Sequence, residues 1–173
     1  MAPDRPNIIL VGLPGAGKTS TGRAVARQLA WPFVDFDTEI EHREHASVAS
    51  IFQKKGEAAF RELERSLSLE MSACRGTVIS AGGGWVTDRD SVALLRQTGS
   101  IIYLRVGPEA AISRLAAART RRPLLEVADP LETMARLYGA RRLLYEEADV
   151  TIDTEVLERK EVIEQVRLHA LSL

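Results

Sequence analysis

Short apolar runs alternate along the chain with stretches of helical periodicity. The apolar runs are rich in β-branched residues and are not interleaved with polar ones, which is typical of strands buried on both faces of a parallel sheet. These runs predict strands at 8–11, 33–34, 77–80, 100–106 and 150–152. Apolar positions spaced three and four apart predict helices between them. The predicted helices cover 19–30, 57–71, 108–117, 131–145 and 157–171.

This alternation predicts a three-layer α/β domain, with about five parallel strands and helices on both faces. The length of 173 residues suits one domain, and we find no internal repeat or low-complexity segment. We therefore expect a single domain over residues 1–173.

Composition narrows the class of protein. The chain is 45% hydrophobic and 27% charged, which is ordinary for a globular protein. Its 23 basic and 24 acidic residues give no basic footprint for nucleic acid, and no apolar run approaches the ~20 residues that span a bilayer. A single cysteine, Cys74, excludes an internal disulfide. With no export signal visible, we expect a cytoplasmic protein without nucleic-acid or membrane partners.

A glycine-rich segment follows the first predicted strand. Residues 12–19 read GLPGAGKT and match G-x-x-x-x-G-K-[ST] at every fixed position. Glycines let backbone N–H groups turn inward around an anion, and the following helix adds its positive dipole end. Lys18 can reach the β- and γ-phosphates, and Thr19 can ligate Mg²⁺. The sequence therefore predicts an ATP site formed by Gly15, Ala16, Gly17, Lys18, Thr19 and Ser20. A switch GTPase is not indicated, because the N-K-x-D guanine signature is missing.

Two carboxylates, Asp35 and Asp37, follow the second predicted strand. If that strand continues, both side chains point the same way. One could hold Mg²⁺ through water, and the other could accept a proton from a substrate hydroxyl. The alternatives are a solvated acidic loop or an N-cap for a helix near Glu39.

Arginines and glycines mark the other candidate positions. Arg61 has acidic neighbours one helical turn away on either side, so it could form a surface ion pair or clamp an anion. Gly82-Gly83-Gly84 could let a ligand approach the backbone or could simply be flexible. The basic segments at 119–122 and 141–142 could bind anions or be solvated. Arg122 could reach the phosphates from a mobile loop.

Together these pieces resemble the shikimate kinase family. The specific combination beyond the phosphate loop is Asp35-x-Asp37, Gly56-Glu57-x-x-Phe60-Arg61-x-x-Glu64, Gly82-Gly83-Gly84, Arg122-Pro123-Leu124-Leu125 and Arg141-x-x-Leu144-Tyr145. Order and separations agree from residue 8 to about residue 153. Departures fall at Leu143, where the family often has proline, and after Thr154, where a proline is missing.

The resemblance implies a P-loop kinase fold and roles for single residues. On the acceptor side, Asp37 orients the 3-hydroxyl of shikimate, while Arg61 and Arg141 bind its carboxylate. The backbone of Gly82, Gly83 and Gly84 contacts the same substrate, with Gly83 as the donor, and Glu64 supports Arg61.

On the phosphate side, the resemblance implies that Thr19 ligates Mg²⁺ directly and that Asp35 and Ser80 hold it through water. Lys18 and Arg122 stabilise the transferred phosphoryl group, with Arg122 on a lid at about 114–126. The substrate-binding helical region is about 37–64.

The implied reaction is transfer of the γ-phosphate of ATP to the 3-hydroxyl of shikimate, on the route to chorismate and the aromatic amino acids. We expect a monomer. A kinase for another small metabolite, such as gluconate or a nucleoside monophosphate, is the first alternative. A non-catalytic ligand sensor is the second. Such sensors are usually fused to a DNA-binding segment, for which the short tail before the first strand leaves no room.

Overall fold

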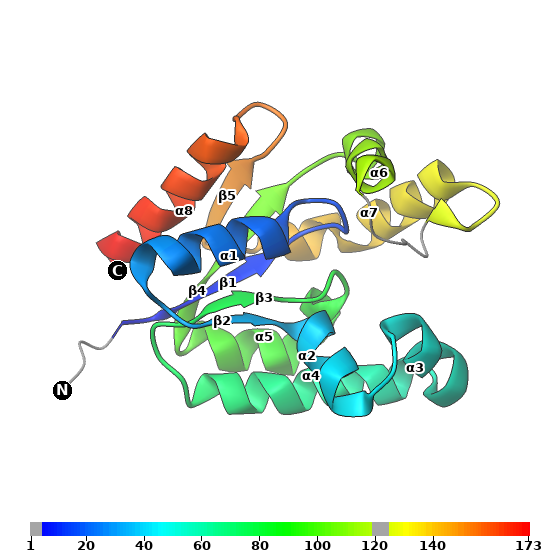
Figure 1. Cartoon of the computed structure of the whole chain (residues 1–173), viewed down its shortest axis with the longest axis horizontal. Coiled ribbons are helices and arrows are strands. Elements are labelled where there is room, and N and C mark those ends of the chain that lie inside the picture. Colours follow the sequence, from blue (N-terminus) through cyan, green and yellow to red (C-terminus); the bar gives the residue numbers. More distant parts are fainter. Residues whose placement is uncertain (1–4, 119–124) are drawn as a thin grey trace.

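The computed structural model describes residues 5–118 and 125–173 (Figure 1). Within them, five strands form one sheet in the order β2-β3-β1-β4-β5, and every neighbouring pair is parallel. The strands are β1 (Asn7–Val11), β2 (Phe33–Asp35), β3 (Val78–Ser80), β4 (Gly99–Arg105) and β5 (Val150–Asp153). The predicted five-stranded parallel sheet is confirmed.

Helices cover both faces of this sheet, as predicted. Figure 1 shows α1 (Lys18–Leu29) and α8 (Arg159–Ser172) on one side, and α4 (Glu57–Ser72) and α5 (Arg89–Arg96) on the other. Beyond the end of the sheet lie α6 (Pro108–Ala117) and α7 (Pro130–Glu146). No helix in the described ranges has the length and apolarity needed to cross a bilayer.

Apolar periodicity did not predict three short helices. They are α2 (Phe36–Glu44), α3 (Val48–Lys55) and α5, and the single turn η1 (Trp85–Thr87) was missed as well. Two of them, α2 and α3, lie within the helical region expected at about 37–64, and α2 is the helix near Glu39 that one alternative allowed. Helices of eight or nine residues are too short to show a clear apolar period, and side-chain caps mark two of them instead. Asp35 accepts a hydrogen bond from the Thr38 N–H at the start of α2, and Ser47 does the same for Ser50 at the start of α3.

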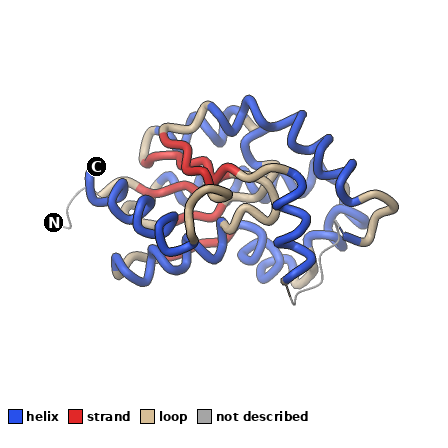
Figure 2. The backbone as a smooth tube through the Cα atoms, turned by 90° about the horizontal axis from the view of Figure 1, so that it is seen from above, coloured by secondary structure: helices blue, strands red, loops and turns tan. Residues whose placement is uncertain are grey.

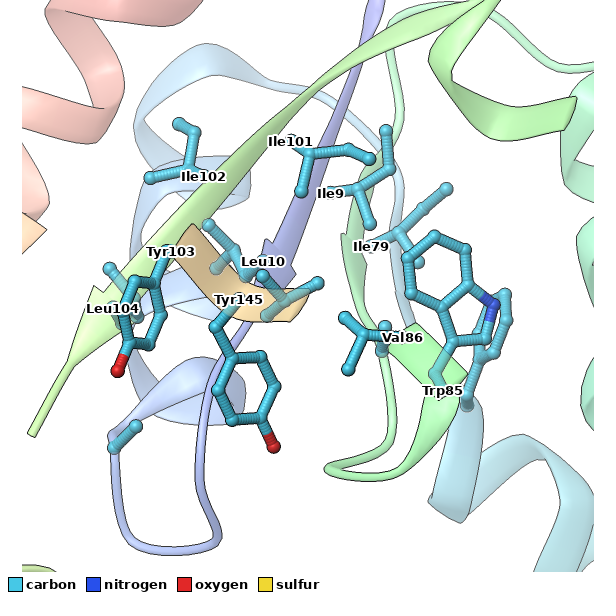
Figure 3. Packing of buried hydrophobic residues seen from close by; sticks show 14 of the residues in the cluster. Ile9, Leu10, Ile79, Trp85, Val86, Ile101, Ile102, Tyr103, Leu104 and Tyr145 are labelled. Atoms are coloured by element: carbon cyan, nitrogen blue, oxygen red, sulfur yellow. The ribbon is translucent and has the colours of Figure 1, made fainter. Parts of the chain in front are cut away.

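The central strand β1 is apolar from Ile8 to Val11 because helices shield both faces of the sheet. Ile8, Ile9, Leu10 and Val11 of β1 have no exposed surface. Figure 2 shows the strands in the middle of the molecule with helices around them, and Figure 3 shows how their side chains pack. Trp85 closes this core below the sheet, and its indole N–H donates to Ser68 Oγ at 2.9 Å.

Strand order fixes where a ligand can bind. From β1 the chain crosses to β2 at one edge, whereas from β3 it passes to β4 on the other side of β1. The helices that follow the neighbouring strands β1 and β3, α1 after β1 and α5 after β3, lie on opposite sides of the sheet, so the two loops diverge at the carboxyl ends (Figure 1). Open α/β sheets bind their ligands at such a switch point. Both glycine-rich loops of the chain, 12–17 and 82–84, lie at this position.

Candidate active site

The loop between β1 and α1 depends on its glycines. Gly12, Gly15 and Gly17 have φ angles of +146°, +86° and +90°. A Cβ atom on Gly12 would lie 2.6 Å from the Leu104 carbonyl oxygen, and one on Gly15 would lie 2.6 Å from that of Ala111. The loop is thus pressed against β4 and α6 in a shape that larger residues cannot adopt.

Lys18 opens α1 and folds back over this loop. Its Nζ donates to the carbonyl oxygens of Gly12 at 2.8 Å and Leu13 at 2.9 Å. Burial lowers the pKa of Lys18 to about 8, and the negative charges of Asp37 and Asp35 partly oppose that shift. An ammonium group held beside a ring of backbone N–H groups suits a polyanion.

Three oxygen-bearing side chains meet beside Lys18. Thr19 Oγ1 donates to Asp35 Oδ2 at 2.6 Å and lies 3.5 Å from Ser80 Oγ. Asp35 and Ser80 are direct partners in the register of β2 and β3, so the sheet itself holds them together. Hydroxyl and carboxylate oxygens are the donors that Mg²⁺ prefers. The set therefore fits the predicted ion.

Asp37 reaches the crevice by a different route from the one expected. The strand does not continue past Asp35, because the Asp35 carboxylate caps α2 and the chain becomes helical at Phe36. Asp37 lies in the first turn of that helix, exposed at the mouth of the crevice. Partial loss of hydration and the nearby charge of Asp35 raise the pKa of Asp37, while Lys18 opposes the shift.

The loop 82–84 after β3 lies at the centre of the site, and side chains from four segments pack against it. A Cβ atom on Gly82 would lie 2.5 Å from Glu64 Oε1 and 3.0 Å from Asp37 Oδ1. One on Gly83 would lie 3.2 Å from Cδ of Pro14, which belongs to the phosphate loop. The three glycines therefore make room for charged side chains to gather.

Arg61 forms the ion pairs that its sequence context allowed. It pairs with Glu64 at 2.5 Å and with Glu57 at 3.1 Å. Its guanidinium also lies against the loop, because a Cβ atom on Gly84 would sit 2.7 Å from Arg61 Cζ. Arg61 is therefore held in place by ion pairs while it faces the crevice.

Glu64 is the most enclosed charged residue of the group, with 2% of its surface exposed. Burial raises its pKa to about 7, and the positive charge of Arg61 opposes that shift. Its Oε1 atom has no hydrogen-bond partner among the described residues.

Arg141 approaches the same loop from α7. Its Nη1 would lie 3.6 Å from a Cβ atom on Gly83. Its positive charge contributes to the lowered pKa of Lys18, so the two cations share one crevice. Next to it, the Tyr145 hydroxyl donates to the Gly83 carbonyl oxygen at 2.5 Å. Sequence reasoning gave Tyr145 no role, although its spacing of four from Arg141 places both on one face of α7.

Part of the predicted lid lies outside the described residues, including Arg119 and Arg122. Residues 114–117 belong to α6. There Arg114 binds the β5–α8 connection through Thr154, at 2.8 Å to its hydroxyl and 2.6 Å to its carbonyl oxygen.

The predicted site residues that the structure describes thus gather at the carboxyl edge of the sheet. The phosphate loop contributes Gly15, Ala16, Gly17, Lys18, Thr19 and Ser20. Around the second loop lie Asp35, Asp37, Arg61, Ser80, Gly82, Gly83, Gly84 and Arg141. Three cations and three carboxylates share this crevice, an arrangement able to bind two anions side by side.

The sequence and the structure of the chain were compared with those of known proteins. The model of the shikimate kinase family matches residues 14–170. The shikimate kinase of Cupriavidus pinatubonensis is 42% identical over 155 residues, which cover 89% of this chain and 80% of that protein. The structure of shikimate kinase from Acinetobacter baumannii in complex with shikimate is 36% identical. It superposes with a TM-score of 0.88 over 97% of this chain and 94% of that one.

A gluconokinase structure from Sinorhizobium meliloti shares only the fold, with 16% identity and a TM-score of 0.62 over 97% of this chain and 93% of that one. Because the family model matches residues 14–170 and a shikimate kinase is 42% identical in sequence, the chain belongs to the shikimate kinase family.

Proposed function

We propose that this chain is a shikimate kinase that transfers the γ-phosphate of ATP to the 3-hydroxyl of shikimate. One observation carries the proposal: the loop 82–84 lies between the phosphate loop and two arginines from separate helices. A small acid held by those arginines would present its alcohol toward the terminal phosphate. The acceptor is the one bound in the A. baumannii relative.

On the acceptor side, Arg61 and Arg141 would bind the substrate carboxylate. Guanidinium groups bind carboxylates through paired N–H donors, and two of them would fix the orientation of the ring. The backbone of Gly82, Gly83 and Gly84 would add contacts close to the ring. Glu64 holds Arg61 by an ion pair and so supports the clamp.

Asp37 would accept a hydrogen bond from the hydroxyl that attacks. Phosphoryl transfer passes through a loose transition state, so positioning matters more than a strong base. The raised pKa of Asp37 suits a group that takes the proton late, as the new phosphate ester forms. The proton then leaves the acceptor oxygen for a carboxylate oxygen of Asp37.

Charge stabilisation would come from the phosphate side. Lys18 would move from the carbonyls of Gly12 and Leu13 to the β- and γ-phosphate oxygens. Thr19, with Asp35 and Ser80 through water, would hold Mg²⁺, which neutralises phosphate charge when bound. Arg122 lies outside the described residues, and its role at the phosphates rests on the sequence.

An acceptor panel tests the proposal. The protein would be incubated with Mg-ATP and, separately, shikimate, gluconate and a nucleoside monophosphate, with ADP release measured. We expect release with shikimate to exceed that with each of the others by orders of magnitude. Equal or greater release with gluconate or the nucleotide would contradict the proposal. Tight shikimate binding without ADP release would instead support a sensor.

A further inference from the structure

We propose that Tyr145 is a positioning residue for the acceptor. Its hydroxyl fixes the peptide group between Gly83 and Gly84 in the loop 82–84. The inference rests on the proposed function, because it concerns the same acceptor site. It assigns a task to a side chain that the proposed mechanism does not otherwise use.

The loop 82–84 has three carbonyl groups, and each has a hydrogen-bond donor. Two of these donors are local. The Gly82 carbonyl accepts from the Trp85 N–H at 3.0 Å, and the Gly84 carbonyl accepts from the Thr87 N–H at 3.1 Å. The middle carbonyl, on Gly83, accepts from Tyr145, which is 62 positions away. Among the described residues, Tyr145 therefore holds this loop from a distant part of the sequence.

Holding that carbonyl fixes a donor as well. A peptide group is planar, and its N–H points away from its C=O. The hydrogen bond from Tyr145 to Gly83 therefore fixes the direction of the Gly84 N–H. A Cβ atom on Gly84 would sit 2.7 Å from Arg61 Cζ, so this part of the loop lies against the clamp.

Tyr145 also lies near the second arginine. Burial raises the pKa of Tyr145 to about 12, and the positive charge of Arg141, four residues before it on α7, opposes that shift. The Tyr145 hydroxyl thus lies near Arg141 and holds the backbone of Gly83, in a loop that packs against Glu64 and Arg61. Loss of this hydroxyl would loosen that loop.

Burial alone does not explain this bond. Tyr103 on β4 stacks on Tyr145, with ring centroids 5.2 Å apart and an interplanar angle of 20°. Figure 3 shows the two rings side by side. Both residues have 0% exposed surface, yet the Tyr103 hydroxyl has no partner among the described residues. The Tyr145 hydroxyl is therefore hydrogen-bonded to the site, whereas the Tyr103 hydroxyl is not.

The test compares Tyr145→Phe with Tyr103→Phe. Each variant keeps its ring, and thermal unfolding confirms that both fold. Steady-state kinetics give kcat and KM for shikimate and for ATP, and calorimetry gives shikimate affinity. For Tyr145→Phe we expect shikimate KM and dissociation constant to rise about three- to tenfold, the effect of one lost hydrogen bond. The KM for ATP should stay within about twofold.

Tyr103→Phe should leave the KM for both substrates and the shikimate affinity within about twofold of wild type, because its hydroxyl has no hydrogen-bond partner among the described residues. Unchanged shikimate affinity in Tyr145→Phe, beside wild-type protein that binds shikimate, would overturn this inference alone. An equal loss in both variants would assign the effect to the ring stack and overturn it too. Wild-type protein that fails to bind shikimate would contradict the proposed function, and this inference with it.

Discussion

At the scale of single residues, the crevice balances charges before any ligand arrives. Several of its charged side chains are held by neighbours: Lys18 by loop carbonyls, Asp35 by Thr19, and Arg61 by Glu64. Burial shifts the pKa of Lys18 down and that of Glu64 up, so both move toward neutrality. A bound triphosphate would reverse this shift for Lys18, because its negative charge stabilises the ammonium form.

Asp37 should matter for turnover more than for nucleotide binding. Replacing it as Asp37→Asn removes the acceptor of the hydroxyl proton and leaves the phosphate loop intact. We expect kcat to fall on the order of 10²- to 10⁴-fold while ATP affinity stays close to that of wild type. Glu39→Gln is a matched control, because Glu39 lies in the same first turn and pairs with Arg43 on the surface. Near-normal turnover in Asp37→Asn would remove Asp37 from the mechanism.

Glu64 should make stability depend on pH. Its folded-state pKa is about 7, above the ordinary value of 4.5, so folding disfavours the charged form. This contribution to stability is complete below about pH 4.5 and is lost as pH rises through 7. The loss should be on the order of a few kcal/mol. In Glu64→Gln the free energy of unfolding should fall less between pH 5 and 8.

Urea unfolding at several pH values measures that difference. The two proteins share every other titrating group, so the difference between their profiles isolates Glu64. Parallel profiles would mean that Glu64 stays charged in the folded protein with an ordinary pKa.

At the scale of elements, the glycines differ in whether their position leaves room for a side chain. Gly15 has a positive φ, and a Cβ atom there would meet backbone of α6. Gly139 lies exposed inside α7, and a Cβ atom there would meet nothing within 4 Å. Substitution by alanine should therefore have opposite effects at the two positions.

Gly139→Ala should stabilise the protein by roughly 0.5–1 kcal/mol, since alanine restricts the unfolded chain and favours helix. Gly15→Ala should destabilise it by more than about 2 kcal/mol, because strain and a clash with backbone add together. Thermal and urea unfolding check both. Stabilisation by Gly15→Ala would contradict the described loop geometry, and destabilisation by Gly139→Ala would contradict the open surroundings of Gly139.

The sequence revealed elements where local signals were long and continuous. All five strands and the five longest helices were predicted within a few residues, because burial on both faces leaves a continuous apolar run. The short helices α2, α3 and α5 show no apolar period of their own, and only the resemblance, with its helical region at about 37–64, indicated both α2 and α3. The direction of Asp37 depended on whether β2 continued, and the competing cap by Asp35 decided against it.

At the scale of the whole molecule, chain topology assembles the site. Neighbouring strands β1 and β3 bring two glycine loops together, and helices α2, α4 and α7 add side chains from three directions. Motif spacing predicted which residues belong to the site, since each motif is local in sequence. It could not predict that Tyr145 reaches Gly83, because that contact depends on how α7 packs against the loop.

The fold serves kinases of several acceptors, so activity must be argued from the site. The central claim is that two arginines on separate helices grip one small acid opposite the phosphate loop. Arg141 and Arg142 allow a sharp test. They are neighbours on α7, yet Arg141 is half-buried beside Gly83 and Arg142 pairs with Glu146 on the surface.

Calorimetric titration of shikimate into Arg141→Ala and Arg142→Ala is the most direct measurement. The account predicts roughly a 10- to 100-fold loss of affinity for Arg141→Ala, the effect of removing a charged hydrogen-bond donor. Arg142→Ala should bind as wild type does. Wild-type affinity in Arg141→Ala would contradict the claim.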